Sequence, residues 1–416
     1  MKRVICLILI GLMLLGIACT AVTVEYPKSA AVEPIELGFD VPEITDYDGF
    51  SYTLSSALID GTKNSNLSPL SIYCALAMVA EGANGKTQTD LLHFLGCEST
   101  DTMRESVSRM LERQTAETET GSLSLCNSLW MSKAFPFRKE YQTLLKDFYS
   151  ADTETVSFGT DAAGRRISAW INKNTNGRIT PDPESMQFDP ITVAVLFNTI
   201  YLKDQWYVPF SEDAIQSGLF TCSDGTTKVV DYLHRFSEER VVYRSEGFMR
   251  YSVSLQSKGT VTFVLPDENT ALSDLLGTPE KMETLLTGGE SVAADVDLLL
   301  PKFAFSDEYE LTDMMCALGL RGAFSDGADF SKMTRVPTRL DRVIQKTVID
   351  VNETGVEAAA YTAVIDAPGD AYSEPVTLPK IEFHLNRPFL FCIEGKWNTL
   401  LFIGTVTEPS PSQIAD

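Results

Sequence analysis

The chain has 416 residues and a formal charge of −23 at neutral pH, because 57 acidic side chains outnumber 34 basic ones. This excess of carboxylates argues against a nucleic-acid-binding protein, since phosphate binding requires a basic patch and the sequence has none of adequate size. Hydrophobic residues make up 44% of the chain, which is ordinary for a globular protein, and an acidic surface suits a soluble exported one.

The first residues have the features of an export signal. Lys2 and Arg3 precede an apolar run over residues 4–17 that ends in small residues. A basic start, a short apolar stretch and small residues before a cleavage point predict a signal peptide over residues 1–18. An uncleaved membrane anchor is an alternative, although the run is short for a spanning helix.

Cys19 directly follows Ala18, which resembles the signal of bacterial lipoproteins, in which the cysteine becomes the lipidated first residue. Gly16 departs from the leucine that is usual three places before that cysteine. We expect an exported protein, extracellular or held at the cell surface by a lipid on Cys19, with plain secretion as the alternative. Residues 19–45 are rich in Pro, Val, Glu and Ala without periodicity, and they predict a tether.

Helix signals come first in the domain that follows. Residues 47–59 have helical spacing. Ser68 as N-cap and Pro69 at the first helical position predict a second helix, which continues to residue 80. This helix is apolar nearly all round, so it must be buried. A third helix is predicted over residues 87–96, where a glycine ends it.

Strand patterns dominate the rest of the chain. Strands are predicted at 123–131, 191–202, 228–233, 240–243, 251–255, 260–265, 296–305, 343–351, 381–385 and 389–406, and helices at 162–175 and 308–318. Helices first and strands later, without strict alternation, indicate an α+β fold. No linker-like break divides the chain, so we expect one large domain over residues 46–409 and a tail over 410–416.

Cysteine and histidine give no sign of a disulfide scaffold or a metal site. The six cysteines after residue 19 are scattered without paired spacing, so buried free thiols are favoured, although a bridge remains open. They are Cys74, Cys97, Cys126, Cys222, Cys316 and Cys392. The three histidines are isolated in sequence, which predicts no zinc site.

Two enzyme-like signals fail closer inspection. Residues 82–87 look like the end of a phosphate-binding loop, but Ala80 stands where the first glycine is required. No G-x-S-x-G or H-E-x-x-H motif occurs, and no histidine lies near a candidate nucleophile in sequence. We therefore predict neither catalysis nor a cofactor.

The most informative stretch is residues 352–364, a run of small residues. It is too rich in alanine for a turn, and Gly355 and Thr362 make it a poor helix. As a strand it would have an inward set of small side chains: Val356, Ala358, Ala360, Thr362 and Val364. Such a segment can enter between two existing strands without disturbing a packed core. The alternative is an ordinary alanine-rich loop.

Several separate stretches resemble the serpin family, in the order that the family has. The first are Asn66-Leu67-Ser68-Pro69-Leu70-Ser71, Glu81-Gly82-Ala83-Asn84-Gly85-Lys86-Thr87, and Phe197-Asn198-Thr199-Ile200-Tyr201-Leu202-Lys203 through Trp206 to Pro209-Phe210. The later ones are Leu300-Pro301-Lys302-Phe303, Leu318-Gly319-Leu320, Ala323-Phe324-Ser325, Asn386-Arg387-Pro388-Phe389-Leu390-Phe391 and Phe402-Ile403-Gly404-Thr405-Val406. Because the set is ordered and covers nearly the whole domain, it indicates a member of this family.

The resemblance implies a serpin fold of three β-sheets and eight to nine helices, with an exposed reactive-centre loop over about residues 354–378. Inhibitory serpins offer this loop to a serine protease, or sometimes a cysteine protease. The protease cuts the loop and forms an acyl-enzyme, and the loop then inserts into a sheet as a new central strand and traps the protease irreversibly. The resemblance thus implies a monomeric inhibitor and not an enzyme.

The resemblance also assigns roles to individual residues. The hinge, which must enter the sheet first, corresponds to Glu353, Gly355, Val356, Glu357, Ala358, Ala359 and Ala360. The breach, where insertion begins, corresponds to Trp206, Lys302 and Glu353, the last two as an ion pair. The shutter, a polar cluster under the sheet, corresponds to Ser68, Ser71, Asn198 and Gln345. Gln345 replaces the family's usual histidine and can both donate and accept. Ordinary packing or a weak surface ion pair is the alternative for the hinge and breach residues.

The family's spacing from Glu353 puts the reactive bond at Gly369-Asp370, within a candidate stretch from Ile365 to Tyr372. No arginine or lysine occurs between Glu353 and Pro379, which argues against a trypsin-like target. Small and aliphatic residues favour elastase- or subtilisin-like proteases, whereas Tyr372 would suit a chymotrypsin-like one. A non-inhibitory serpin that binds or carries a ligand is the main alternative, and an exported hydrolase is another.

Overall fold

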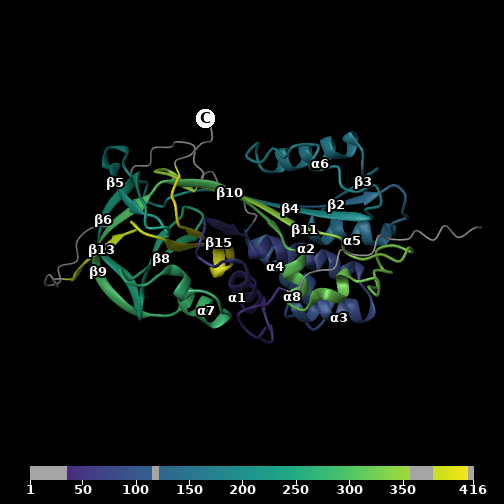
Figure 1. The fold of residues 1–416 in the computed structure, drawn as a ribbon, viewed down its shortest axis with the longest axis horizontal. Coiled ribbons are helices and arrows are strands. Elements are labelled where there is room, and N and C mark those ends of the chain that lie inside the picture. The colour runs from purple at the N-terminus through teal and green to yellow at the C-terminus, as the bar shows by residue number, and fades with distance from the viewer. Residues whose placement is uncertain (1–34, 115–120, 357–377, 411–416) are drawn as a thin grey trace, which may run out of the picture. The chain divides into compact units, whose positions relative to one another are not determined.

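The computed structural model describes residues 35–114, 121–356 and 378–410 (Figure 1). The predicted signal peptide, most of the tether, most of the reactive-centre loop and nearly all of the tail lie outside the described residues. Among the described residues, no helix combines the length and the apolar composition that crossing a bilayer requires.

Six strands form the sheet that carries the candidate site. Their order is β10-β11-β12-β4-β2-β3, with β10 at Phe303–Glu310, β11 at Val343–Val351, β12 at Gly355–Val356, β4 at Ala194–Gln205, β2 at Gly121–Ser132 and β3 at Asp152–Val156. The neighbours β4 and β11 run parallel, whereas the two-residue β12 lies antiparallel to both. At one end of these two strands, β4 and β11 are therefore paired directly, and at the other end β12 lies between them.

Nine strands form the second hydrogen-bonded sheet. Along its path lie β1 (Ser65–Leu67), β15 (Leu400–Val406), β14 (Phe389–Glu394), β8 (Thr260–Pro266), β7 (Phe248–Ser254), β6 (Thr227–Ser245), β9 (Glu290–Pro301) and β13 (Lys380–His384), while β5 (Gln216–Thr221) pairs with β6. The long strands β6 and β9 pair with each other. Strand β6 also pairs with β5 and β7, and β9 also pairs with β13. Two of the three sheets expected from the resemblance are thus joined through β6 and β9.

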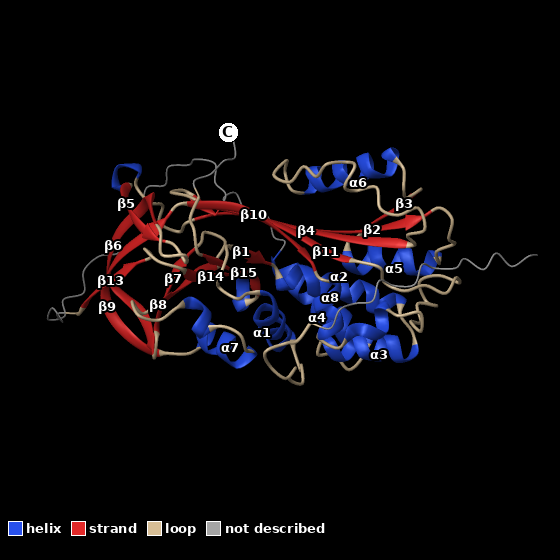
Figure 2. Ribbon diagram, in the orientation of Figure 1, coloured by secondary structure: helices blue, strands red, loops and turns tan. Residues whose placement is uncertain are grey.

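Eight α-helices occur in the described residues. They are α1 (Tyr47–Leu58), α2 (Pro69–Gly82), α3 (Gly85–Phe94), α4 (Thr100–Gln114), α5 (Lys139–Tyr149), α6 (Asp161–Asn174), α7 (Pro279–Thr287) and α8 (Thr312–Ala317). Figure 2 shows α6 on one side of β2 and β4, with α2 and α5 on the opposite side. The two faces of the six-stranded sheet therefore pack into separate hydrophobic clusters, a small one under α6 and a large one that includes α2.

Helix α2 forms as its sequence predicts. Ser68 is the N-cap, and its Oγ accepts a hydrogen bond from the N–H of Ser71 at 3.3 Å. Pro69 occupies the first helical position, where its missing N–H costs nothing. All residues of α2 are buried, as the apolar pattern on every side requires.

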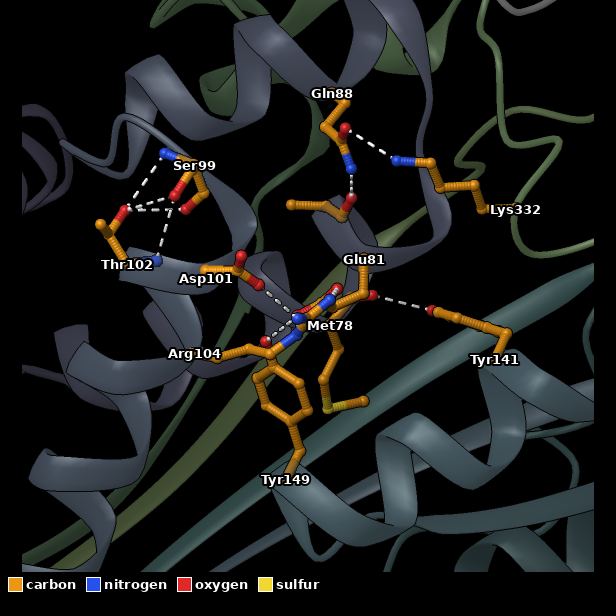
Figure 3. A network of polar contacts seen from close by, with 11 residues as sticks. Met78, Glu81, Gln88, Ser99, Asp101, Thr102, Arg104, Tyr141, Tyr149 and Lys332 are labelled. Atoms are coloured by element: carbon orange, nitrogen blue, oxygen red, sulfur yellow. Dashed lines mark hydrogen bonds and ion pairs between the residues drawn. The ribbon is translucent and has the colours of Figure 1, made fainter.

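A partly buried ion pair, in which Glu81 is the buried partner, attaches two further helices to α2 (Figure 3). Glu81 on α2 accepts hydrogen bonds from Nε and Nη2 of Arg104 on α4, at 2.6 and 2.7 Å. Tyr149 at the end of α5 donates its hydroxyl to the same carboxylate at 2.9 Å, and burial raises the pKa of that hydroxyl. Because the carboxylate is both paired and hydrogen-bonded, it fixes α4 and α5 against the helix beneath the sheet.

Some sequence predictions were wrong in detail. The helix predicted over 308–318 starts only at Thr312, because residues 308–310 pair with β11 as the end of β10. The strand predicted over 296–305 is two strands, which belong to different sheets. The third helix begins at Gly85 instead of residue 87. Helices α4, α5 and α7 were not predicted from the sequence.

Candidate functional site

The chain reverses direction directly after β11, in a turn made by residues 352–355. The N–H of Asn352 donates to the carbonyl of Gly355 at 3.0 Å, which closes the turn. Oδ1 of Asn352 accepts from the N–H and the hydroxyl of Thr354, at 3.1 and 2.8 Å. Asparagine favours such turns because its side chain replaces a backbone acceptor. The turn therefore directs the chain back into the sheet as β12.

Strand β12 lies between β11 and β4 at the end where these two strands are apart. Val356 pairs with Val351 of β11 on one side and with Asp204 of β4 on the other. The side chain of Val356 is 3% exposed, which agrees with its predicted inward orientation. The other members of the predicted inward set lie outside the described residues, as do hinge residues Glu357, Ala358, Ala359 and Ala360.

Gly355 permits a very close approach to β4. A Cβ atom on Gly355 would lie 2.0 Å from the carbonyl oxygen of Asp204, a distance that no side chain tolerates. The neighbouring backbone atom cannot give way, because it belongs to a paired strand. A glycine at this position is therefore a steric requirement of the inserted β12.

The turn is also held from outside by the segment that follows β4. The backbone N–H of Trp206 donates to the carbonyl of Thr354 at 3.0 Å, and its indole Nε1 donates to the carbonyl of Asn352 at 2.8 Å. The N–H of Phe210 donates to the carbonyl of Glu353 at 3.0 Å. Trp206 is fully buried and stacks edge-on against Phe210. Three consecutive carbonyls of the turn are thus bound to the segment that follows β4.

Lys302 and Glu353 form an ion pair beside this turn. Nζ of Lys302 lies 2.6 Å from Oε2 of Glu353, and the two side chains are 30% and 24% exposed. Burial raises the pKa of Glu353, but the hydrogen bond and the charge of Lys302 lower it more, so the pKa of this carboxyl is below its ordinary value. The structure thus brings the predicted breach residues to one place.

The four predicted shutter residues form one hydrogen-bonded network. The side-chain amide of Gln345 accepts from the N–H of Ser68 at 3.0 Å and donates to its carbonyl at 2.8 Å. The hydroxyl of Ser71 donates to Oδ1 of Asn198, whose Nδ2 donates to Asn127 at 2.6 Å. Gln345 is 2% exposed and occupies both of its hydrogen-bonding groups. Asn127 completes the network and was not predicted.

The closed part of the sheet lies directly over this network. Residues 196–199 of β4 pair with residues 343–346 of β11, and one of these pairs joins Asn198 to Gln345. A small cavity of about 20 Å³ lies beside the network, and another of about 10 Å³ lies beneath Val356. The sheet is therefore divided into a closed half above the shutter and an open half that β12 has begun to fill.

Comparison with known proteins assigns this arrangement to a family. The family model described as serpin (serine protease inhibitor) matches residues 46–409. The chain belongs to the serpin family. It is 30% identical to Serpin B6 of Macaca fascicularis over 84% of this chain and 94% of that relative.

Solved structures agree with the fold. Serpin48 of the insect Tenebrio molitor is 25% identical and superimposes with a TM-score of 0.75, over 88% of this serpin and 98% of that chain. Thyroxine-binding globulin in complex with thyroxine is also 25% identical, with a TM-score of 0.72, over 88% and 98% of the two chains. The expected α+β serpin fold is therefore confirmed.

Asp204 is a buried acid at the breach of this serpin that the sequence analysis missed. It is fully buried and accepts hydrogen bonds from the N–H and hydroxyl of Ser257 and from the N–H of Gln205. Burial raises the pKa of Asp204, and these hydrogen bonds offset only part of that effect. Asp204 follows Leu202 by two residues, so strand alternation places both side chains on the same face of β4. This alternation could have predicted that Asp204 points inward.

Two histidines that are far apart in the sequence lie near the same carboxylate in the folded serpin. Nε2 of His234 lies 2.8 Å from Asp297, and Nε2 of His384 lies 3.8 Å from the same carboxylate. Within the described residues, no group of three histidine, cysteine or acidic side chains is arranged to hold a metal ion. Cys74, Cys97, Cys222, Cys316 and Cys392 are free thiols within the described residues, and Cys97 and Cys126 are only half-buried.

The remaining predicted sites lie outside the described residues. These are the reactive bond at Gly369-Asp370, the stretch from Ile365 to Tyr372, and the lipidation site at Cys19.

Proposed function

We propose that this serpin irreversibly inhibits serine proteases by inserting its cleaved loop into the six-stranded sheet. The observation that supports this most directly is the position of β12, because Gly355 and Val356 already lie between β4 and β11. A loop that starts inside the sheet needs only to extend along the same path. The covalently attached protease would then be carried with it and distorted before deacylation.

The register of β12 predicts where the following residues would lie after insertion. Continued along β4 and β11, it places Ala358 between Leu202 and Ile349, and Ala360 between Ile200 and Thr347. Because these neighbours are already packed in the core, only small side chains fit between them without moving the core. The alanine-rich composition of the hinge supports insertion for this reason.

Full insertion requires the closed half of the sheet to open. In the same register Thr362 reaches the row of Asn198 and Gln345, the pair that lies over the shutter. About a dozen added residues, at about 0.5–1.5 kcal/mol per net hydrogen bond plus buried apolar area, would release on the order of 10 kcal/mol. This release exceeds the cost of separating four residue pairs, so insertion would be spontaneous once cleavage frees the loop.

We propose Gly369-Asp370 as the reactive bond and elastase- or subtilisin-like enzymes as targets. The absence of arginine and lysine between Glu353 and Pro379 supports this choice over trypsin-like enzymes. Mass spectrometry of the C-terminal peptide released by the protease would identify the cleaved bond. Cleavage outside the stretch from Ile365 to Tyr372 would contradict the assignment.

We also propose that the protein is exported and anchored through a lipid on Cys19, since an apolar run precedes this cysteine. Metabolic labelling with a fatty acid should mark the wild type and not Cys19→Ser. Release of Cys19→Ser into the medium would agree with the anchor. An unlabelled wild type recovered from the medium would indicate plain secretion.

Inhibition itself is tested by incubation with a panel of serine proteases. A complex that survives SDS supports the proposal, whereas clean loop cleavage without a complex with every protease contradicts it. Cleavage should also raise the Tm sharply, because the inserted form gains a central strand. An unchanged Tm would mean that the loop does not insert.

A second candidate function is ligand binding by a non-inhibitory serpin. A cleft of about 800 Å³, which is within the usual range of small-molecule sites, lies between β5 and the residues before β14. Arg387, Glu268 and Leu272 are among its lining residues. The similarity to thyroxine-binding globulin also favours this candidate. Clean cleavage without a complex would support it.

A further inference from the structure

The turn after β11 contains a side chain that the family resemblance does not assign. We propose that Asn352 is a positioning residue, which pre-forms the turn from which the inserted strand extends. This inference rests on the insertion mechanism proposed above, and it adds the residue that prepares the first step.

The side chain of Asn352 makes the internal contacts of the turn. Its Oδ1 accepts both hydrogen-bonding groups of Thr354, the N–H at 3.1 Å and the hydroxyl at 2.8 Å. Its Nδ2 lies 3.4 Å from a carboxylate oxygen of Asp350, so the amide has a defined orientation. Replacement by alanine removes the acceptor and leaves the N–H of Thr354 without this bond. The turn would then keep the backbone hydrogen bond from Asn352 to Gly355 and the contacts from outside, and it would lose the contacts that its side chains make.

The outside contacts from Trp206 and Phe210 bind backbone carbonyls and do not depend on the turn's side chains, whereas Lys302 pairs with the side chain of Glu353. Trp206 and Phe210 bind the carbonyls of residues 352–354. These bonds fix where the hinge lies, but they leave the reversal of its direction to the turn itself. The side chain of Asn352 supports this reversal together with the backbone bond to Gly355, because both hold the chain in the geometry that brings Gly355 back beside Gln205.

The same reversal is required before and after insertion. In the register of β12, the strand that extends from Val356 remains connected to β11 through the turn at 352–355. A turn that is already formed removes the loop-closure entropy from the first step of insertion. An unformed turn would add that cost while the acyl-enzyme is free to hydrolyse, so more of the inhibitor would be cleaved without trapping the protease.

The first measurement is hydrogen exchange, which needs no target protease. The amides of residues 354–356 should exchange between about fivefold and thirtyfold faster in Asn352→Ala than in the wild type, since one or two hydrogen bonds are lost. Thr354→Val, which removes only the hydroxyl donor, should give a smaller increase. Asn352→Ser should restore part of the protection, because serine supports an equivalent but weaker turn. A peptide from α1 serves as the internal reference.

The second measurement is the number of inhibitor molecules consumed for each protease trapped. This number should rise in Asn352→Ala and return toward the wild-type value in Asn352→Ser. A residue that merely stabilised the native fold would lower the urea midpoint without changing this number. Equal exchange at 354–356 in wild type and Asn352→Ala, or an equal number of inhibitor molecules consumed by the two, would overturn the proposal.

The two proposals can fail separately. If the wild type forms no SDS-stable complex with any protease, the inhibitory function is wrong, and hydrogen exchange at residues 354–356 still decides whether Asn352 holds the turn. If the wild type traps a protease and Asn352→Ala does so equally well, the function stands and the positioning role is wrong.

Discussion

Val356 and Asp204 lie opposite each other in antiparallel register, and both side chains are buried. The second residue pair between β12 and β4 therefore places an apolar hinge residue next to an ionisable group of β4. This relationship makes the start of insertion sensitive to the size and polarity at residue 356 and to the protonation of residue 204.

Replacing Val356 by arginine should abolish formation of the SDS-stable complex and make the protein a substrate. A buried unpaired charge costs several kcal/mol, which would expel β12 from the sheet. Val356→Ala should retain inhibition, since it adds neither charge nor volume. Both variants are compared by the fraction of protease trapped. A complex formed equally by Val356→Arg would refute the role of this residue.

Loss of the Lys302–Glu353 ion pair should lower stability by about 1 kcal/mol at neutral pH, as expected for a partly buried pair. Because the pKa of Glu353 is lowered in the folded state, the stabilisation is present above the ordinary pKa and lost as pH falls through the folded value. The urea midpoints of wild type and Lys302→Met should therefore converge at acid pH. Glu353→Gln should remove this pH dependence, and a difference that persists in acid would contradict it.

Replacing Gln345 by leucine should destabilise the shutter by about 1–3 kcal/mol. The side chain is the acceptor for the N–H of Ser68, and leaving this buried group unpaired costs about 1–3 kcal/mol, whereas the carbonyl of Ser68 keeps the N–H of Ile72 at 3.3 Å. The matched control is Gln345→His, which restores a side chain that can donate and accept. This variant should add a dependence on pH near 6.5 that the wild type lacks. An unchanged urea midpoint in Gln345→Leu would refute the network.

Asp204→Asn should raise the urea midpoint at neutral pH. Burial raises the pKa of Asp204, so the native state loses stability as pH rises through the folded pKa, and a neutral isostere avoids this loss. The advantage should shrink as pH falls and the wild-type carboxyl becomes protonated. Ser257→Ala removes a hydrogen bond that lowers this pKa, so it should shift the effect to higher pH. A destabilised Asp204→Asn at every pH would contradict this account.

Local signals predicted the parts of the site that depend on short stretches of chain. Ser68 and Pro69 begin α2 as expected, because capping involves only neighbouring residues. The inward orientation of Val356 followed from strand alternation. Asp204 and Asn127 were missed because their partners, Ser257 and Asn198, lie more than fifty residues away in the chain.

The sequence-based prediction was also wrong at residues 308–310, where the end of a strand adjoins a helix. Residues 308–310 have no strong strand pattern and continue into a helix, so the sequence alone predicts them as part of that helix. Pairing with residues 344–346 of β11 makes them strand instead. Long-range hydrogen bonds override local preference in such cases, because one paired edge satisfies every backbone group along it.

The sequence by itself determined the family, the capped helix under the sheet and the small side chains of the hinge, because each depends on residue identity and spacing. The tertiary structure alone decided that β12 lies in the sheet before any cleavage. It also placed the side chain of Asn352 in hydrogen-bonding contact with Thr354 within the turn, and Asp204 beside Val356. These features arise where β4, β11 and the segment after β4 meet, and close packing of distant segments leaves no pattern in any one of them.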